Sequence, residues 1–193
     1  MISRHMKKFA AAETGVAAIE TALILPFLLF LYFGMIDLTS LIAFNRKITY
    51  SASVAADATS QNKTSMLESA TTDYYKGVEL IMSPTPTDRI KVDIYGYRPS
   101  GGAAVQIWKT SKSTGPTCAS TPSVSAMPPL MTAGNDIIVA IACMQYTPYV
   151  ATFLGENVLG ATTFNLEQVV MLRPRSSLTL TCYESTIGGT VCS

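Results

Sequence analysis

The chain has 193 residues, of which 48% are hydrophobic and 14% charged, and its mean hydropathy is +0.29. This composition excludes a chain that is disordered throughout, and it favours one folded domain with a membrane-associated segment. The formal net charge is +1, and the first fifteen residues hold three basic residues, Arg4, Lys7 and Lys8, against Glu13. The remainder therefore has 11 basic and 12 acidic residues, so no basic field is left to bind nucleic acid.

An apolar run follows this basic leader. It extends from Val16 to Phe33, which is 18 residues. At about 1.5 Å per residue this is roughly 27 Å of helix, close to the hydrocarbon thickness of about 30 Å. A cleaved secretory signal is the alternative, but its apolar region is normally about 7–15 residues long and ends at small residues. The run favours a retained transmembrane helix over residues 16–36, with a cytoplasmic N-terminus because cations precede it.

We expect the helix to continue over residues 37–60. Apolar residues recur here every three or four positions, the helical period, and they change toward alanine: Leu38, Leu41, Ile42, Ile48, Ala52, Ala55 and Ala56. Alanine on such a stripe lets another element approach closely. The predicted organisation is a leader over residues 1–15, a transmembrane helix over 16–36, its extension over 37–60 and a periplasmic domain over 61–193.

The residues beyond 60 predict an α+β domain with an antiparallel sheet. Helical periodicity predicts a second helix, and alternation of apolar and polar residues predicts strands. In chain order we expect a helix over 66–82, a strand over 90–94, a turn over 98–102, a strand over 104–109, a loop on the sheet edge over 111–135, a central strand over 136–146, an irregular or briefly helical segment over 147–160, a strand over 162–173 and a hairpin tail over 178–193.

All four cysteines lie beyond the predicted span: Cys118, Cys143, Cys182 and Cys192. There they would meet an oxidising periplasm, in which disulfides form. They form no Cys-x-x-Cys motif and have no histidine nearby, which argues against zinc or thioredoxin chemistry. Three pairings are open, and the turn residues just before Cys192 favour Cys182–Cys192 together with Cys118–Cys143.

Catalytic chemistry has little support in the sequence. The only histidine, His5, precedes the span, so a Ser-His-Asp or Cys-His site is excluded from the body. Asp136 follows Gly134 and Asn135, a pattern that is more typical of a turn than of a calcium site. Trp108 lies among strand residues and is expected in the core or an interface. We expect no catalytic residue, no metal and no cofactor.

Glu20 is the one carboxylate in the apolar run. It lies four residues after Val16, so the two side chains share a helix face. A charged side chain costs about 2.5–3.5 kcal/mol at mid-membrane by insertion scales, and less near the interface, which favours a functional reason for it. The alternative is an interfacial glutamate that only extends toward the headgroups. Around it are small residues that let membrane helices pack closely, Ala17, Ala18, Thr21 and Ala22.

These N-terminal residues resemble the TadE-like and TadF-like minor pseudopilins of the tight-adherence (Flp-type) pilus system of bacteria. The matching residues run from Gly15 to Phe27 (GVAAIETALILPF) and continue with Gly34-Met35-Ile36-Asp37 and the alanine-rich stretch 51–57. A softer match runs from Gln145-Tyr146-Thr147-Pro148-Tyr149 to Val170-Met171-Leu172-Arg173. The resemblance covers about half of the chain.

The resemblance implies a site and a set of partners. In this family a prepilin peptidase, which accepts little besides glycine before the cut, would cleave between Gly15 and Val16. The glutamate at Glu20 would then neutralise the amino terminus of a neighbouring subunit. The implied fold is a long pilin-like helix, transmembrane in its first half, on an antiparallel sheet with one further helix. The implied partners are the prepilin peptidase, other minor pseudopilins, the major Flp pilin and the inner membrane.

Departures from related families narrow the expected role. The major Flp pilin typically has an aromatic residue where Thr21 follows Glu20, and it lacks a full ectodomain. We therefore expect a non-enzymatic minor subunit that helps to initiate, assemble or cap the pilus. It would be a single-pass inner-membrane protein with a periplasmic C-terminal domain, later incorporated into the extracellular pilus. The alternative is an unprocessed, membrane-anchored periplasmic binding or sensor module.

Overall fold

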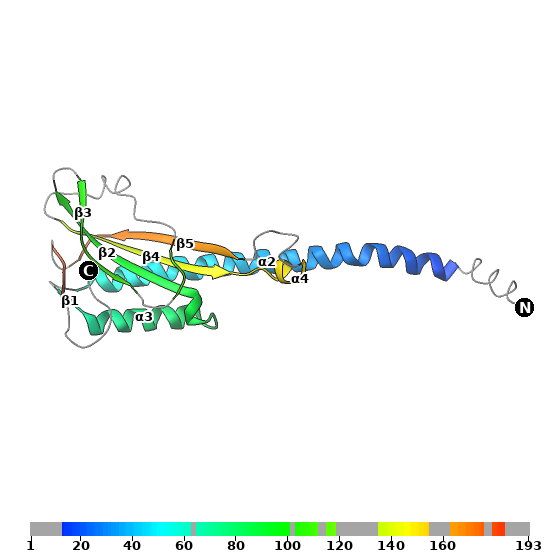
Figure 1. The fold of residues 1–193 in the computed structure, drawn as a ribbon, viewed down its shortest axis with the longest axis horizontal. Helices are drawn as coiled ribbons and strands as arrows, with labels where there is room; N and C mark the ends of the chain where they lie inside the picture. The colour runs from blue at the N-terminus through cyan, green and yellow to red at the C-terminus, as the bar shows by residue number, and fades with distance from the viewer. Residues whose placement is uncertain are drawn as a thin grey trace, which may run out of the picture. The chain divides into compact units, whose positions relative to one another are not determined.

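The computed structural model describes residues 13–62, 65–100, 103–111, 115–118, 135–154, 163–175 and 179–183. Figure 1 shows the elements, which are α2 (Glu13–Ser60), β1 (Ser65–Leu67), α3 (Glu68–Met82), a short 3-10 helix η1 (Thr87–Arg89), β2 (Ile90–Ser100), β3 (Ala103–Ser111), β4 (Ile137–Tyr146), α4 (Tyr149–Leu154), β5 (Phe164–Leu172) and β6 (Thr181–Tyr183). The prediction of an α+β fold with a long N-terminal helix is confirmed.

The chain divides into two compact units. The first unit comprises residues 1–40 and 148–162, and the second comprises residues 41–147 and 163–193. Helix α2 contributes to both, because the division falls inside it. Short helix α4 belongs to the first unit although it is more than 100 residues away in sequence from the N-terminal part of α2.

The sheet of the second unit has four strands in the order β3-β2-β4-β5, and all neighbours are antiparallel. Strand β4 is interior, as predicted, with Ile138 opposite Gly96 of β2 and Leu172 of β5. Gln145 is the only residue of β4 that is not buried. Such a run of buried residues is typical of a strand that is covered on both faces.

One face of the sheet forms a core with the second half of α2 and with α3. Their buried side chains are Ile48, Ala52, Ala55, Ala56, Tyr75, Val78 and Met82, and they pack with Val92, Ile94, Trp108, Ala140 and Ala142 of the strands. The three alanines of α2 are fully buried. Their short side chains let the helix approach the sheet closely, which confirms the packing that the alanine stripe predicts.

Strands β2 and β3 come close together at Gly96, because glycine has no side chain. Gly96 lies opposite Trp108 in the register of the two strands. A Cβ atom at Gly96 would lie 2.2 Å from Cε2 of the Trp108 indole, so only glycine leaves room for the ring.

The opposite face of the sheet carries a second core. Its buried residues are Tyr95, Tyr97, Ala104, Ile137, Val139 and Ile141, and Cys118 and Met171 pack against them. Gly115 has φ of 125°, and a Cβ atom there would lie 2.3 Å from the carbonyl oxygen of Ile90. The segment 115–118 therefore starts beside Ile90, which β3 does not pair, and reaches this face of the sheet at Cys118. The sequence does not predict this contact with the face. The rest of the predicted loop, 112–114 and 119–134, lies outside the described residues.

Two predicted boundaries also differ from the structure. The helix predicted over 66–82 begins at Glu68, because Ser65–Leu67 pairs in parallel with Thr181–Tyr183. Arg98, Pro99 and Ser100 continue β2, with Ser100 opposite Ala103, so the turn is shorter than predicted. Over β6 the tail pairs with β1, and residues 184–193 lie outside the described residues, so the tail hairpin stays a prediction. The pairing of β1 with β6 joins segments distant in sequence, which local periodicity does not detect.

Candidate functional site

The first part of α2 has an apolar surface that the chain itself does not cover. Its exposed side chains include Val16, Ile19, Leu23, Ile24, Leu25, Phe27, Leu28, Phe30, Leu31, Tyr32 and Met35. By length and composition α2 is the one helix in the described part of the chain that could cross a membrane. A contiguous apolar surface of this extent marks contact with lipid or with other helices.

The predicted processing site lies at the start of this surface. Gly15 and Val16 are both within α2, and Val16 is exposed. A Cβ atom at Gly15 would meet no described atom within 4 Å, and Gly15 does not have a positive φ. Neither packing nor backbone conformation therefore requires a glycine at this position. A requirement outside the folded chain, such as a peptidase specificity, would explain it.

Glu20 lies on the exposed surface of α2, one helical turn after Val16. Among the small residues beside it, Thr21 donates its hydroxyl to the carbonyl oxygen of Ala17 at 2.8 Å. This bond satisfies the hydroxyl within the helix, so Thr21 offers a small surface without an unpaired donor. Glu20 is thus the charged group of a surface that otherwise consists of apolar and small side chains.

Asp37 has a role that the sequence did not indicate. One carboxylate oxygen accepts a hydrogen bond from the backbone N–H of Tyr149 at 2.7 Å, and the other accepts one from Val150 at 2.8 Å. Asp37 thereby binds two of the N–H groups that the first turn of α4 leaves unpaired. Figure 1 shows α4 beside α2, where these bonds join them. The only sequence signal is a lone carboxylate at the end of the apolar run.

The predicted cysteine site is described in part. Cys118 and Cys143 form a disulfide that closes a sequence separation of 25 residues, which is the pairing that the sequence favours. Cys143 is buried on β4. Cys182 lies on β6, but its side chain and Cys192 are outside the described part of the chain, so the pairing Cys182–Cys192 stays a prediction.

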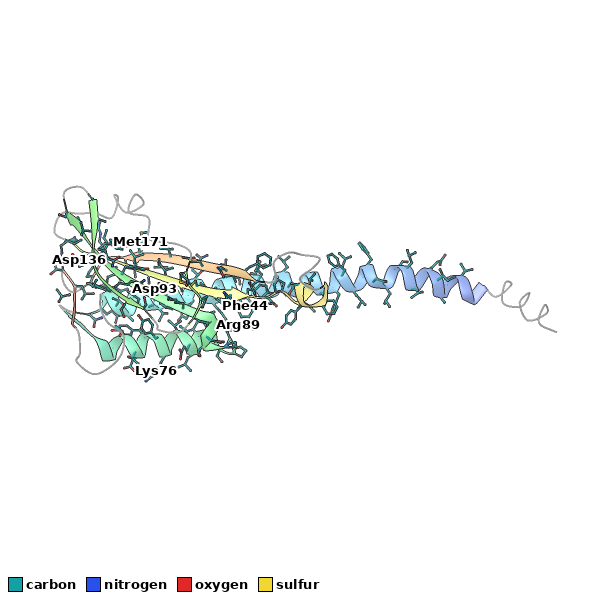
Figure 2. The ribbon with its side chains drawn as sticks, in the orientation of Figure 1. Phe44, Lys76, Arg89, Asp93, Asp136 and Met171 are labelled. Atoms are coloured by element: carbon teal, nitrogen blue, oxygen red, sulfur yellow. A yellow bond between two sulfur atoms is a disulfide. The ribbon has the colours of Figure 1, made fainter. Side chains whose placement is uncertain are left out.

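Asp136, labelled in Figure 2 where β4 begins, organises one end of the sheet. Its oxygens accept hydrogen bonds from Nε and a terminal nitrogen of Arg98 at 2.8 and 2.9 Å, and from the backbone N–H of Leu180 at 2.8 Å. The bond to Asp136 raises the pKa of Arg98. Trp108 donates its indole N–H to the carbonyl oxygen of Leu180 at 2.9 Å. Asp136 and Trp108 therefore have structural roles: hydrogen bonds occupy the Asp136 carboxylate, and the Trp108 side chain is buried.

A second polar cluster lies around Asp93, also labelled in Figure 2. Lys109 places its ammonium 3.6 Å from Oδ2 of Asp93 and 5.0 Å from the centre of the Tyr95 ring. Burial lowers the pKa of Lys109, but the hydrogen bond to Tyr95 and the attraction of Asp93 outweigh it, so the net pKa is raised. Oδ1 of Asp93 accepts no hydrogen bond from the described residues. The cluster holds a charged pair in a partly buried position and offers no nucleophile with an adjacent base.

The described side chains contain no group of three or more His, Cys, Asp or Glu residues that could hold a metal ion. The surface that the structure leaves for partners is the exposed part of α2, which carries Gly15, Val16 and Glu20. The structure thus places Gly15, Val16 and Glu20 together, and the disulfide lies apart from them in sequence on the sheet.

Comparison with known proteins agrees with this location. Residues 15–57 match the sequence model of the family described as TadE-like protein. No curated protein and no solved structure matches the chain. The matched segment begins at Gly15 and covers both the exposed part of α2 and its alanine stripe. The resemblance seen in the sequence is confirmed over this segment: the N-terminal helix of this chain is similar to TadE-like proteins.

Proposed function

We propose that this protein is a minor pseudopilin, processed by a prepilin peptidase, that takes part in the initiation, assembly or tip formation of a tight-adherence pilus. The observation that carries the proposal is the apolar surface of α2 with Glu20 one turn after Val16, at the start of the TadE-like match. Its role is structural and non-catalytic. Its partners are the peptidase, other minor pseudopilins, the major Flp pilin and the inner membrane.

Processing would occur between Gly15 and Val16 on the cytoplasmic side of the inner membrane. Support comes from Gly15, because no feature of the described structure requires a glycine there. The basic residues of the leader favour a cytoplasmic N-terminus by the positive-inside rule. The disulfide Cys118–Cys143 favours an oxidising compartment, the periplasm, for the remainder of the chain.

Glu20 would act in assembly. A carboxylate surrounded by lipid or by apolar helices is costly, and an amine from another chain offsets part of that cost. Cleavage creates such an amine at Val16 of each subunit. Because Glu20 is exposed on α2, it is available to the terminus of a neighbouring helix. Ala17, Ala18 and Thr21 beside it leave room for that helix to approach.

The test is the mass of the N-terminal peptide of the membrane-extracted protein, in cells with and without the prepilin peptidase. We expect a terminus at Val16 only where the peptidase is present. Gly15→Ala should block this cleavage. Gly34→Ala is the matched control, because a Cβ atom would meet no described atom within 4 Å at either glycine.

An intact leader in both strains would overturn the proposal. That outcome would favour the second candidate, an unprocessed inner-membrane anchor that presents a periplasmic binding or sensor domain. Cleavage in Gly15→Ala and Gly34→Ala alike would show that the peptidase does not recognise Gly15, and it would remove the proposed processing site while leaving the membrane anchor in place.

A further inference from the structure

We infer that α4 is an interfacial anchor: Asp37 holds it at the outer boundary of the bilayer, where Tyr149 contacts the lipid headgroup region. This inference rests on the part of the proposed function that places α2 across the inner membrane. It adds a second point of membrane contact, drawn from a segment that follows β4 in the sequence.

The level of Asp37 along α2 sets the level of α4. From Val16 to Asp37 the helix rises about 30 Å at about 1.5 Å per residue, which equals the thickness of a typical hydrocarbon core. A span that begins at Val16 therefore ends at Asp37, at the headgroup boundary. The two hydrogen bonds from Tyr149 and Val150 start α4 at that same level.

The composition of α4 suits a boundary between lipid and water. Its sequence is YVATFL, with no charged residue in its first or last turn. The Tyr149 side chain is 59% exposed. Tyrosine is enriched at membrane interfaces because its ring is apolar and its hydroxyl reaches water. Tyr32, five residues before Asp37 on α2, is also exposed and packs edge to face with Phe33.

The bonds to Asp37 also remove an obstacle to lipid contact. Backbone N–H groups that lack a partner are costly near hydrocarbon, and the first turn of any helix leaves four of them. Asp37 pairs two of these in α4. In return, the donors stabilise a carboxylate at the end of an apolar helix, as an anion is stabilised at a helix N-terminus.

The experiment uses the full chain in phosphatidylcholine–phosphatidylglycerol vesicles that contain phosphatidylcholine brominated either near the headgroup or deep in the acyl chain. Tyr149→Trp supplies the probe. The parent chain has a single tryptophan, Trp108, which is buried, so its emission is subtracted as background. Leu28→Trp, within the span, is the positive control. Leu80→Trp is the comparison position, because Leu80 on α3 belongs to the second unit and is 78% exposed.

We expect the shallow bromine to quench Tyr149→Trp more than the deep bromine, and the deep bromine to quench Leu28→Trp. If Leu28→Trp is quenched and Tyr149→Trp is not, the interfacial anchor is wrong while the membrane span stands. If Leu28→Trp is not quenched, α2 does not insert, and the proposed function fails together with the inference. Equal quenching of Leu80→Trp and Tyr149→Trp would overturn the assignment to α4.

The role of Asp37 is tested in the same vesicles. Asp37→Ala, added to Tyr149→Trp, should reduce the shallow quenching and leave Leu28→Trp unchanged. Asp73→Ala is the matched control, because Asp73 is exposed and its carboxylate lies 3.8 Å from the ammonium of Lys76, one turn away. Formation of the Cys118–Cys143 disulfide, measured by mass, verifies that each variant is folded. Unchanged quenching in Asp37→Ala would show that Asp37 does not position α4.

Discussion

The two halves of α2 are continuous in sequence and opposite in environment. Up to Leu38 the large apolar side chains are mostly exposed, whereas Ile48, Ala52, Ala55 and Ala56 are buried in the second unit. The first half uses leucine, isoleucine and phenylalanine, and the second half uses alanine. The difference shows that one helix can serve two surroundings: large side chains suit lipid or partner helices, and short ones suit a closely packed sheet.

A feature that the two halves share makes this possible. Threonine and serine hydroxyls in both halves donate to the carbonyl four residues earlier, as in Thr21 to Ala17 at 2.8 Å and Thr59 to Ala55 at 2.8 Å. These two hydroxyls are thus satisfied within the helix, whereas the buried hydroxyl of Ser51 has no hydrogen-bond partner among the described residues. What separates the halves is therefore the shape of the apolar surface rather than the pattern of hydrogen bonds.

The largest expected effect is on pilus assembly, and it concerns the exposed half of α2 alone. Glu20→Gln should still be cleaved but should fail to join the pilus, because the neutral amide cannot offset the charge of a neighbouring amine. Assembly is measured as the amount of the protein in sheared pili. Glu20→Asp, which retains the charge, should recover part of the assembly. The urea midpoint of the second unit should not change in either variant. Normal assembly of Glu20→Gln would refute this role.

The next effect should appear only in the second unit. Asp136→Ala leaves Arg98 and the N–H of Leu180 without their partner, and it should destabilise this unit by about 3 kcal/mol. This is the low end of the range for broken buried pairs, because the Arg98 side chain is 41% exposed. Urea denaturation followed by Trp108 fluorescence measures it. The surface variant Asp73→Ala should change stability by less than about 0.5 kcal/mol. Equal effects would contradict the assignment.

Enlarging alanine compares the two halves of α2 directly. Ala55→Leu inserts volume into a fully buried position and should destabilise the second unit by about 1–3 kcal/mol. Ala18→Leu makes the same change on the exposed half and should leave the urea midpoint unchanged. If both variants unfold at the parent midpoint, the close packing of α2 on the sheet is wrong.

The smallest effect is a dependence on alkaline pH. Burial raises the pKa of the Tyr75 phenol, which bonds to the hydroxyl of Thr110 at 3.0 Å. The stability that the neutral phenol contributes is therefore complete below the unfolded pKa of about 10, and it is lost as pH rises above that value. Urea midpoints across this range measure the loss. Tyr75→Phe should flatten the dependence, and Tyr50→Phe, at an exposed position, should not.

Prediction from sequence succeeded where the signal lies within a few neighbouring residues. The long helix, the strands and the interior position of β4 follow from periodicity and from runs of apolar residues. The processing site and the role of Glu20 rest on residue types at short spacing, and they stay predictions. The pairing Cys118–Cys143 was favoured only because turn residues pointed to the other pair. The loop containing Gly115 and Cys118 was predicted but its contact with one face of the sheet was not, because serine, threonine and proline content indicates a loop but not the face of the sheet that it crosses.

The sequence by itself determined that this chain has an apolar helix of membrane length, one carboxylate at its start and an α+β domain behind it. Only the tertiary structure decided that Asp37 accepts hydrogen bonds from the first turn of α4, that β1 pairs with β6 and that Asp136 bonds to both Arg98 and Leu180. The physical reason is the range of the interactions. Helical and strand periods depend on residues a few positions apart, whereas these hydrogen bonds form only after packing has brought distant segments together.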